Sequence, residues 1–258
     1  MKRKRGNRKR EMSDFEVLAL KILSNLALND KIDEDVIEFL RQMQMEHYTL
    51  LEKYEVLEER INIDNKTSLL KYNEVLLVNI VKAISRYWQS SRKSSLLPIS
   101  YLRMDLDDFS RVNNIYGHDI GDNVLIAIAK TMKKVSRPTD YLFRFGGEEF
   151  DIVLPVTDLE GAEKYAQKLL NEIRKIRIPL TIGGYVHITA SIGVAAFNLN
   201  YTAGGPIFAK DILKMYHKVQ KQADFACYHA KSTGKDRFCS YKKGINYERI
   251  MEKYGSAH

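Results

Sequence analysis

The chain has 258 residues, of which 45% are hydrophobic and 29% charged, and its formal net charge is +8. This length accommodates one full domain with a sizeable core and a smaller additional element. The composition excludes a membrane-spanning helix, because no apolar run reaches the roughly 18 residues that such a helix needs. The basic segment 1–10 is not expected to be a secretory signal, because no apolar stretch follows it.

Residues 1–12 carry most of the excess positive charge. Seven of the 41 Lys and Arg residues lie there, and the remaining 34 are nearly balanced by 33 Asp and Glu residues. Such a run is typical of a disordered, solvated tail. Contact with an anionic surface, either lipid or nucleic acid, is a second interpretation, although the segment has no aromatic residues that could stack on bases.

Residues 13–63 are expected to form a helical region with a coiled-coil stalk. The segment 13–28 begins with Ser-Asp, an N-cap signal, and continues with amphipathic spacing. Over residues 36–61 the apolar positions recur at alternating spacings of four and three, which is the heptad pattern of a coiled coil. Because His47 and Tyr54 fit this seam imperfectly, a helix packed on its own domain is the alternative. We favour a parallel two-stranded coiled coil and therefore a homodimer formed through the N-terminal helices.

From Asp64 onward the pattern changes to alternating strands and helices. The expected elements are a helix ending near Trp88, a Ser-rich loop, a strand at 100–106, a helix at 122–136, strands at 141–145 and 150–155 joined by a Gly-Gly turn, a helix at 159–176, a strand at 187–197, a helix at 212–231 and a short strand near 238–242. This β-α-β-β-α-β order predicts an α+β domain, with an antiparallel-rich sheet backed by helices on one face. We place the domain at residues 64–245 and expect 246–258 to form a C-terminal tail.

The two cysteines, Cys227 and Cys239, lack a CxxC spacing and nearby paired ligands. They therefore indicate neither a zinc site nor a disulfide framework. Cysteine usage of this kind favours a reducing compartment, and we expect the protein to be cytoplasmic.

Acidic residues gather at two strand ends that this topology brings together. The strand at 100–106 ends in MDLDDF, with Asp105, Asp107 and Asp108, and the turn RFGGEEF adds Glu148 and Glu149. Carboxylates from two strand ends, with a backbone carbonyl between them, make a hard oxygen site suited to Mg²⁺ and phosphoryl transfer. A solvated hairpin tip is the alternative for the glutamates, and capping of the following helix is the alternative for Asp107 and Asp108. Asp105 is in phase with the strand and has no capping role.

Three segments together resemble the GGDEF family of diguanylate cyclases. RFGGEEF resembles the signature in its GGEEF form, DLDDFSRVNNIYGHDIGD resembles the run that precedes it, and ADFACYHAKSTGKDRF resembles a later segment. They occur in the family order within about Asp64 to Tyr241. The resemblance implies a nucleotidyl-cyclase, palm-like core that condenses two GTP into cyclic di-GMP and two pyrophosphates at a homodimer interface. It also implies dependence on Mg²⁺, with Mn²⁺ as a possible substitute.

The resemblance further implies a role for each matching residue. Asp105 and Glu148 would ligate Mg²⁺ through their carboxylates, and Leu106 through its carbonyl. Glu148 would also accept the proton of the attacking 3′-hydroxyl, and Glu149 would assist with a second metal. An amide and a carboxylate together satisfy the donors and acceptor of guanine, which is a basis for excluding adenine. The other matches are Asn113, Asp122 and His118 for the guanine nucleotide, Lys231 and Lys235 for the β- and γ-phosphates, and Gly146, Gly147 and Arg144 paired with Asp64 for the structure of the site.

The segment RPTD, residues 137–140, lies five residues upstream of GGEEF. Its residues and spacing resemble the family's R-x-x-D inhibitory site, which would bind the product cyclic di-GMP through Arg137 and Asp140. The planar donors of arginine suit a phosphate or a guanine edge. A charged turn before a strand is the alternative interpretation.

The sequence also departs from the family pattern. The entry D-x-L-T-G-L-x-N-R appears as DNKTSLLKY, and Ser110 stands where a phosphate-contacting lysine is usual. Because the metal ligands and the guanine-recognition residues are retained, we expect a working but weakened active site. The alternatives are a catalytically inactive receptor for cyclic di-GMP and an enzyme that makes a mixed adenine-guanine dinucleotide. Retention of Asp122 argues against the second.

Overall fold

The computed structural model describes residues 38, 41–50, 53, 62–90, 96–181, 183–200, 209–247 and 249–250. The chain divides into two compact units, Met1–Glu58 and Glu59–His258. In the first unit, residues 41–50 are helical and their side chains are largely exposed. The basic tail, the predicted helix at 13–28 and most of the heptad seam lie outside the described residues, so the coiled coil and the dimer stay predictions. No helix within the described ranges is long and apolar enough to cross a membrane.

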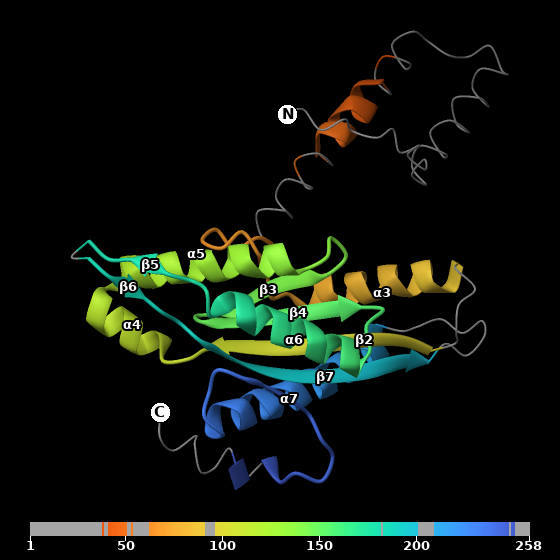
Figure 1. Cartoon of the computed structure of the whole chain (residues 1–258). Helices are drawn as coiled ribbons and strands as arrows, with labels where there is room; N and C mark the ends of the chain where they lie inside the picture. The colour runs from red at the N-terminus through yellow and green to blue at the C-terminus, as the bar shows by residue number, and fades with distance from the viewer. Residues whose placement is uncertain are drawn as a thin grey trace, which may run out of the picture. The chain divides into compact units, whose positions relative to one another are not determined.

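A six-stranded mixed sheet forms the centre of the second unit (Figure 1). Its strands are β1 (Leu70–Lys71), β2 (Leu96–Leu106), β3 (Tyr141–Gly146), β4 (Glu149–Pro155), β7 (Ala190–Asn200) and β8 (Phe238–Ser240). The spatial order is β1-β3-β4-β2-β7-β8, in which β1 is parallel to β3, β8 is parallel to β7 and the other neighbours are antiparallel. The antiparallel-rich α+β prediction is therefore confirmed. A small second sheet, β5 (Ile178–Pro179) with β6 (Tyr185–Val186), was not predicted.

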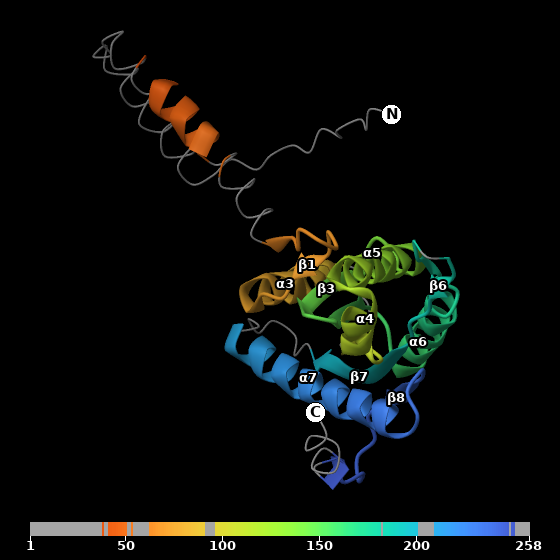
Figure 2. The ribbon, with the colours of Figure 1, turned by 90° about the vertical axis from the view of Figure 1, so that its left-hand side faces the viewer.

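Helices cover both faces of the sheet, so the prediction of helices on one face only is wrong (Figure 1, Figure 2). Successive residues of β2 alternate between two core clusters: Leu102 and Met104 belong to one, and Ile99 and Tyr101 to the other. A sheet buried on both faces needs apolar residues at both parities of its strands, and β2 supplies them. The helices are α5 (His118–Val135) and α6 (Leu159–Ile173) on the first face, α3 (Glu74–Ser90) and α7 (Ala209–Ser232) on the second, and α4 (Phe109–Tyr116) directly after β2.

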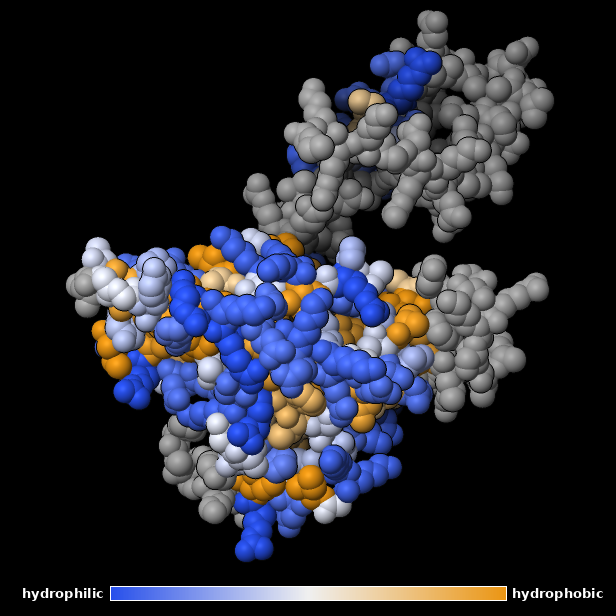
Figure 3. Space-filling view, viewed as in Figure 1, coloured by the Kyte–Doolittle hydropathy of each residue, from blue (hydrophilic) through white to orange (hydrophobic). Residues whose placement is uncertain are grey.

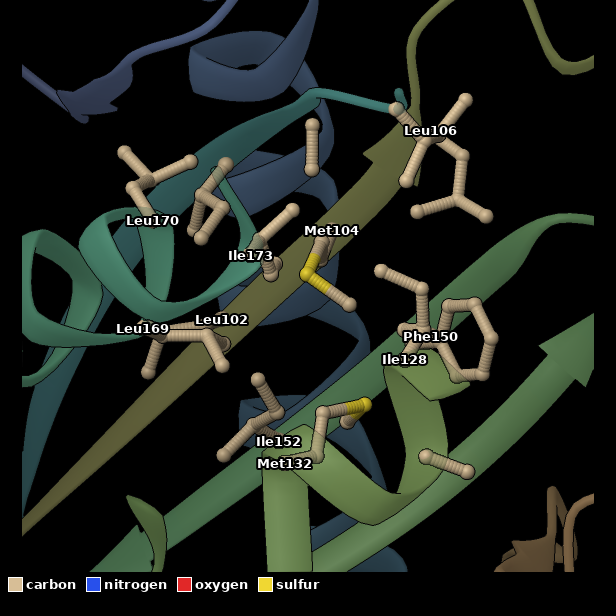
Figure 4. Packing of buried hydrophobic residues seen from close by; sticks show 14 of the residues in the cluster. Leu102, Met104, Leu106, Ile128, Met132, Phe150, Ile152, Leu169, Leu170 and Ile173 are labelled. Atoms are coloured by element: carbon tan, nitrogen blue, oxygen red, sulfur yellow. The ribbon is translucent and has the colours of Figure 1, made fainter. Parts of the chain in front are cut away.

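The first core cluster fixes the strands that carry the acidic residues. Figure 4 shows side chains of β2 and β4 meeting those of α5 and α6, among them Met104, Phe150 and Ile128. All three are fully buried, and burial of such a side chain contributes about 1.5–3 kcal/mol. The face of the molecule in Figure 3 is largely hydrophilic, with apolar residues only in small separate patches. The sheet therefore holds the ends of β2 and β4 rigidly, and those ends carry the site described next.

Candidate active site

The acidic ends of β2 and β4 meet because the two strands are paired in register. Asp105 lies opposite Glu149, and the backbone N–H of Leu106 donates to the carbonyl of Glu148 at 3.4 Å. A pocket of about 490 Å³ opens at this point. It is lined by Asp105, Leu106, Asp107, Asp108, Phe109, Ser110, Glu148, Tyr228, Lys231 and Lys235. The three predicted metal ligands and the two predicted phosphate lysines thus share one pocket, although up to 130 positions separate them in the sequence.

The Gly146-Gly147 turn has open space around its backbone and is held in place by Arg144. A Cβ built on either glycine meets no atom within 4 Å, and Gly147 has φ +48°, a left-handed conformation that glycine adopts without strain. Arg144 donates to the Gly147 carbonyl from Nε at 3.1 Å and from Nη2 at 2.8 Å. Its Nη1 lies 3.2 Å from Asp64 Oδ1. The bare backbone of the turn therefore lies open beside Glu148, which lines the pocket, while Arg144 ties the turn to Asp64.

Asp64 is the anchor of this support. Its Oδ1 accepts hydrogen bonds from the backbone N–H of Thr67 at 2.8 Å and from Thr67 Oγ1 at 2.6 Å. Burial acts to raise the pKa of Asp64, but the Thr67 hydrogen bonds and the charge of Arg144 outweigh burial and hold the pKa below its usual value. The carboxylate is thus charged near neutral pH and the ion pair with Arg144 persists.

The capping interpretation of Asp107 and Asp108 is wrong. Asp107 is buried, and it accepts hydrogen bonds from Thr189 Oγ1 and Ser191 Oγ, both at 2.7 Å. Asp108 occupies the N-cap position of α4 with φ +55°, and its side chain makes no cap hydrogen bond. Its Oδ1 lies instead 2.6 Å from Lys235 Nζ. The left-handed backbone at Asp108 explains the failure of the prediction, because N-cap side chains normally reach their helix from extended backbone.

Lys231 pairs directly with a predicted metal ligand. Its Nζ lies 2.7 Å from Asp105 Oδ2. Burial raises the pKa of Asp105; the charge of Lys231 opposes this, and the nearby carboxylate of Glu148 adds to it. The pKa of Lys231 is raised in turn, because attraction to Asp105 outweighs the effect of burial. The pocket is lined by four carboxylates, those of Asp105, Asp107, Asp108 and Glu148, and by two ammonium groups, those of Lys231 and Lys235.

The donor set fits a divalent cation that shares its shell with a ligand. Among the described residues, no three Asp, Glu, His or Cys side chains converge closely enough to hold a metal by themselves. Asp105, Glu148 and the carbonyl of Leu106 supply hard oxygen donors on one side of the pocket, and Mg²⁺ typically takes its remaining ligands from water and substrate phosphates. The residues fit such an ion, because the carboxylates that line the pocket outnumber its lysines and a cation would offset their charge.

The predicted guanine-recognition residues are carried by α4 and α5. A Cβ built on Gly121 would lie 1.9 Å from Asn113 Oδ1, so the Asn113 side chain rests on Gly121, the residue before Asp122. Asp122 is half-buried, and its Oδ1 lies 2.5 Å from Lys66 Nζ. His118 is exposed at the first position of α5. The structure thus places Asn113 against the residue that precedes Asp122 and adds Lys66, a residue that the sequence analysis had treated only as a departure from the family pattern.

A buried ion-pair network beneath the turn was missed entirely. Arg103 and Asp151 face each other on β2 and β4, 5% and 0% exposed, with Arg103 Nε 2.8 Å from Asp151 Oδ1. Arg103 Nε also lies 3.1 Å from Asp224 Oδ1, Nη1 lies 3.7 Å from Glu149 Oε2, and the guanidinium carbon lies 3.9 Å from the centroid of the Phe145 ring. The available signal was a charged residue among the apolar residues of each of two strands, Arg103 and Asp151, at positions that pair in register.

The charged groups of Arg103 and Asp151 lie close together, but the hydrogen-bond geometry between them is poor. Neither oxygen of Asp151 accepts a hydrogen bond of regular geometry from the described residues, despite the short distance to Arg103 Nε. Burial raises the pKa of Asp151 to about 7, against the attraction of Arg103. The pKa of Arg103 is itself raised, because the attraction of the surrounding carboxylates outweighs burial. Arg103 is therefore charged, and Asp151 changes its charge near neutral pH.

Arg137 and Asp140 lie in the turn between α5 and β3. The backbone N–H of Arg137 donates to Asp140 Oδ2 at 2.7 Å, and the N–H of Asp140 donates to the carbonyl of Arg137 at 3.0 Å. Burial raises the pKa of Asp140, partly offset by Arg137. Both residues border a pocket of about 250 Å³ that Lys164 and Lys168 of α6 also line. The segment is thus a charged turn and also one wall of a basic pocket.

Relatives of known sequence carry the same domain. The family profile described as "Diguanylate cyclase, GGDEF domain" matches residues 62–237. Diguanylate cyclase DgcM of Escherichia coli is 36% identical over 138 residues, which are 54% of this chain and 30% of DgcM. The bifunctional diguanylate cyclase/cyclic di-GMP phosphodiesterase MucR of Pseudomonas aeruginosa is 32% identical over 185 residues, 71% of this chain and 24% of MucR. The chain thus spans less than a third of the length of these two relatives.

Solved structures share the fold. The coiled coil and GGDEF domain of DgcB from Caulobacter crescentus, in complex with c-di-GMP, matches 80% of this chain and 98% of its own, with 21% identity and a TM-score of 0.61. Diguanylate cyclase SiaD from Pseudomonas aeruginosa, in complex with its activator SiaC, matches 87% and 80% of the two chains, with 26% identity and a TM-score of 0.56. The sheet, the paired acidic strand ends and the match of the profile over most of the chain lead to one conclusion. The chain belongs to the GGDEF diguanylate cyclase domain family.

Proposed function

We propose that the protein is a diguanylate cyclase that condenses two GTP into cyclic di-GMP and two pyrophosphates. The observation that carries the proposal is the meeting of the β2 end with the GGEEF turn, which gathers Asp105, Leu106, Glu148, Lys231 and Lys235 around one pocket. Five groups with matched roles are thus within reach of one triphosphate. Family membership supports the choice of reaction, and the names of DgcM and MucR include the same activity.

Each side chain in the pocket has a distinct task in this proposal. When bound, Mg²⁺ or Mn²⁺ would neutralise the triphosphate and polarise the phosphorus that is attacked. Asp105, Glu148 and the Leu106 carbonyl would hold that ion, with Glu149 near a second one. Glu148 would accept the proton of the 3′-hydroxyl.

The lysines and the α4–α5 residues act on the two ends of the nucleotide. Lys231 and Lys235 would leave their carboxylate partners for the β- and γ-phosphates and stabilise the charge of the departing pyrophosphate. Asn113 and Asp122 would bind the guanine edge, with His118 at the rim of the same pocket. Ser110 lines the triphosphate pocket without adding a cation, so we expect weaker GTP binding than a lysine there would give.

A homodimer is part of the proposal, because each site holds one GTP and needs the 3′-hydroxyl of another. Linkage of two domains through N-terminal helices raises their effective concentration and restricts their orientation. The domain limits 13–63 and 64–245 and the anionic-surface role of the basic tail belong to the same proposal. A cytoplasmic location is also part of the proposal, in keeping with the free thiols of Cys227 and Cys239.

Product inhibition by cyclic di-GMP is a further part of the proposal. The pocket beside Arg137 and Asp140 offers cationic donors and a carboxylate, which suit the phosphates and guanine edges of cyclic di-GMP. A bound dinucleotide there would restrain domain orientation and leave the metal site untouched.

A second candidate is a receptor that binds cyclic di-GMP without making it. The contact of Lys231 with Asp105 and the presence of Ser110 favour it, because both reduce the positive charge available to a triphosphate. Chromatography of the products formed from GTP, from ATP and from their mixture with Mg²⁺ separates the candidates. Cyclic di-GMP from GTP alone supports the cyclase. No product, together with saturable binding of cyclic di-GMP, supports the receptor, and a mixed dinucleotide would contradict both.

A further inference from the structure

We propose that Lys66 is a third base-recognition residue. Its ammonium group, while paired with the Asp122 carboxylate, donates a hydrogen bond to O6 of guanine. This assignment rests on the proposed function for the identity of the nucleotide. It extends base recognition to a residue of the loop 64–69, which lies 56 positions before Asp122 in the sequence. The observations that support it are one short contact, one rigid loop and the geometry of the guanine edge.

The contact joins two side chains that remain accessible. Lys66 Nζ lies 2.5 Å from Asp122 Oδ1, and the two side chains are 39% and 40% exposed. An ion pair this exposed contributes only about 0–1 kcal/mol to stability, so stabilisation of the fold is a weak reason for its presence. Both charged groups can still meet a ligand that approaches from solvent.

The loop that carries Lys66 is firmly held. The backbone N–H of Asp64 donates to the carbonyl of Leu69 at 2.8 Å, and the N–H of Ser68 donates to the carbonyl of Asp64 at 2.7 Å. Lys133 Nζ on α5 donates to the Ser68 carbonyl at 2.7 Å, which ties the loop to the helix that bears Asp122. Lys66 therefore projects from a loop that is closed by its own hydrogen bonds and attached to α5, and its side chain reaches Asp122 from there.

The guanine edge fits this arrangement. A carboxylate that binds guanine accepts N1–H on one oxygen and N2–H on the other, and O6 then lies beside the oxygen that accepts N1–H. An ammonium group on that oxygen has three donors, so it can hold the carboxylate and O6 at once. The Asp122 carboxylate has about four lone-pair positions, and Lys66 uses one of them. The ion pair thus leaves room for the base.

Adenine would be disfavoured at this site. It carries an amino group where guanine carries O6, so the Lys66 ammonium would face a donor. A site gains specificity when the same group attracts the correct ligand and repels the competitor.

The test compares two nucleotides that cannot condense. Binding of 3′-deoxy-GTP and 3′-deoxy-ATP to the full chain in Mg²⁺ is measured by calorimetry for the wild type, Lys66→Met and Lys66→Arg. Because the 3′-hydroxyl is missing, no turnover disturbs the equilibrium. Lys71→Met is the matched control: it removes the same charge from an exposed position two residues beyond the loop. We expect the preference for guanine over adenine to fall roughly tenfold in Lys66→Met, and to stay within twofold in Lys66→Arg and Lys71→Met.

Three results would overturn the assignment. If Lys66→Met weakens the binding of both nucleotides equally and leaves the preference for guanine over adenine unchanged, Lys66 acts only as a general positive charge. Tighter binding of 3′-deoxy-GTP to Lys66→Met would mean that Lys66 blocks Asp122 instead of assisting it. If the wild type binds neither nucleotide, the proposed function fails together with the assignment, whereas the first two results leave the proposed function intact.

Discussion

Replacement of Arg103 by methionine should strongly destabilise the domain. Methionine keeps much of the length of the side chain but removes the cation that faces Asp151. The Asp151 carboxylate is fully buried and Arg103 Nε lies 2.8 Å from it, so no solvent can take the place of the lost partner. Removal of one member of a buried ion pair typically costs about 3–5 kcal/mol, a large part of the roughly 5–15 kcal/mol that stabilises a domain.

The size of the loss should depend on pH. With Arg103 present, burial already raises the pKa of Asp151 to about 7. Without the guanidinium that pKa must rise further, and the carboxyl will bind a proton in place of its lost partner. Holding that proton in the folded state costs more free energy at pH 8 than at pH 6, because the aspartate of the unfolded chain is ionised at both pH values. We therefore expect a loss in the free energy of unfolding of about 3 kcal/mol or more at pH 8, and a smaller one at pH 6.

A double variant separates the ion pair from simple loss of packing. Arg103→Met with Asp151→Leu replaces both charges by apolar groups, which in buried pairs is often neutral or stabilising. Urea unfolding of the wild type, both single variants and the double variant gives the coupling energy. Recovery of most of the lost stability in the double variant is expected. A single variant within 1 kcal/mol of the wild type at pH 8, or a double variant no more stable than Arg103→Met, would refute the reasoning.

The remaining predictions concern single residues. Asp151→Asn should reduce a pH dependence. Because the folded pKa of Asp151 lies above that of an unfolded aspartate, the wild type should lose stability as pH rises from about 4 through 7, and the variant should lose less, in urea unfolding at several pH values. Glu148→Gln should abolish synthesis of cyclic di-GMP with an unchanged circular dichroism spectrum; near-normal turnover would remove Glu148 from the mechanism. Asp122→Ala should weaken guanine nucleotide binding by roughly 1–3 kcal/mol and adenine nucleotide binding much less, and equal losses would contradict base recognition. Arg137→Ala should relieve late slowing of the reaction and leave initial rates unchanged, unless added micromolar cyclic di-GMP proves not to inhibit the wild type at all.

Long periodic segments could be predicted from the sequence, whereas very short strands could not. The strands β2 and β4 and the helices α5, α6 and α7 were all anticipated, because each carries several turns or alternations of apolar residues. The two-residue strands β1, β5 and β6 contain too few residues to form a pattern. The faces that the helices cover were predicted wrongly, since the order of elements leaves that choice open and only the apolar residues at both parities of β2 reveal it.

For the site, the sequence predicted neighbours in the sheet better than contacts between loops. The juxtaposition of Asp105 with the glutamates followed from strand order alone. The capping role of Asp107 was wrong because its partners, Thr189 and Ser191, lie more than 80 positions away. The contact of Lys66 with Asp122 depends on where a loop is placed by the whole fold, and local propensity carries no information on that.

The hydrogen bonds of Asp107 also determine when a newly made chain can acquire its site. This carboxylate joins the end of β2 to Thr189, Ser191 and the backbone N–H of Asp236, across separations of 82, 84 and 129 residues. Contacts of such long range form late, because the entropy of closing the intervening chain must be overcome first. During synthesis on the ribosome, the residues that line the pocket are therefore not all in place until almost the entire domain has emerged. An incomplete chain would have the GGEEF turn but no finished pocket, so nucleotide binding would begin only after the segment that carries Lys231, Lys235 and Asp236 has docked.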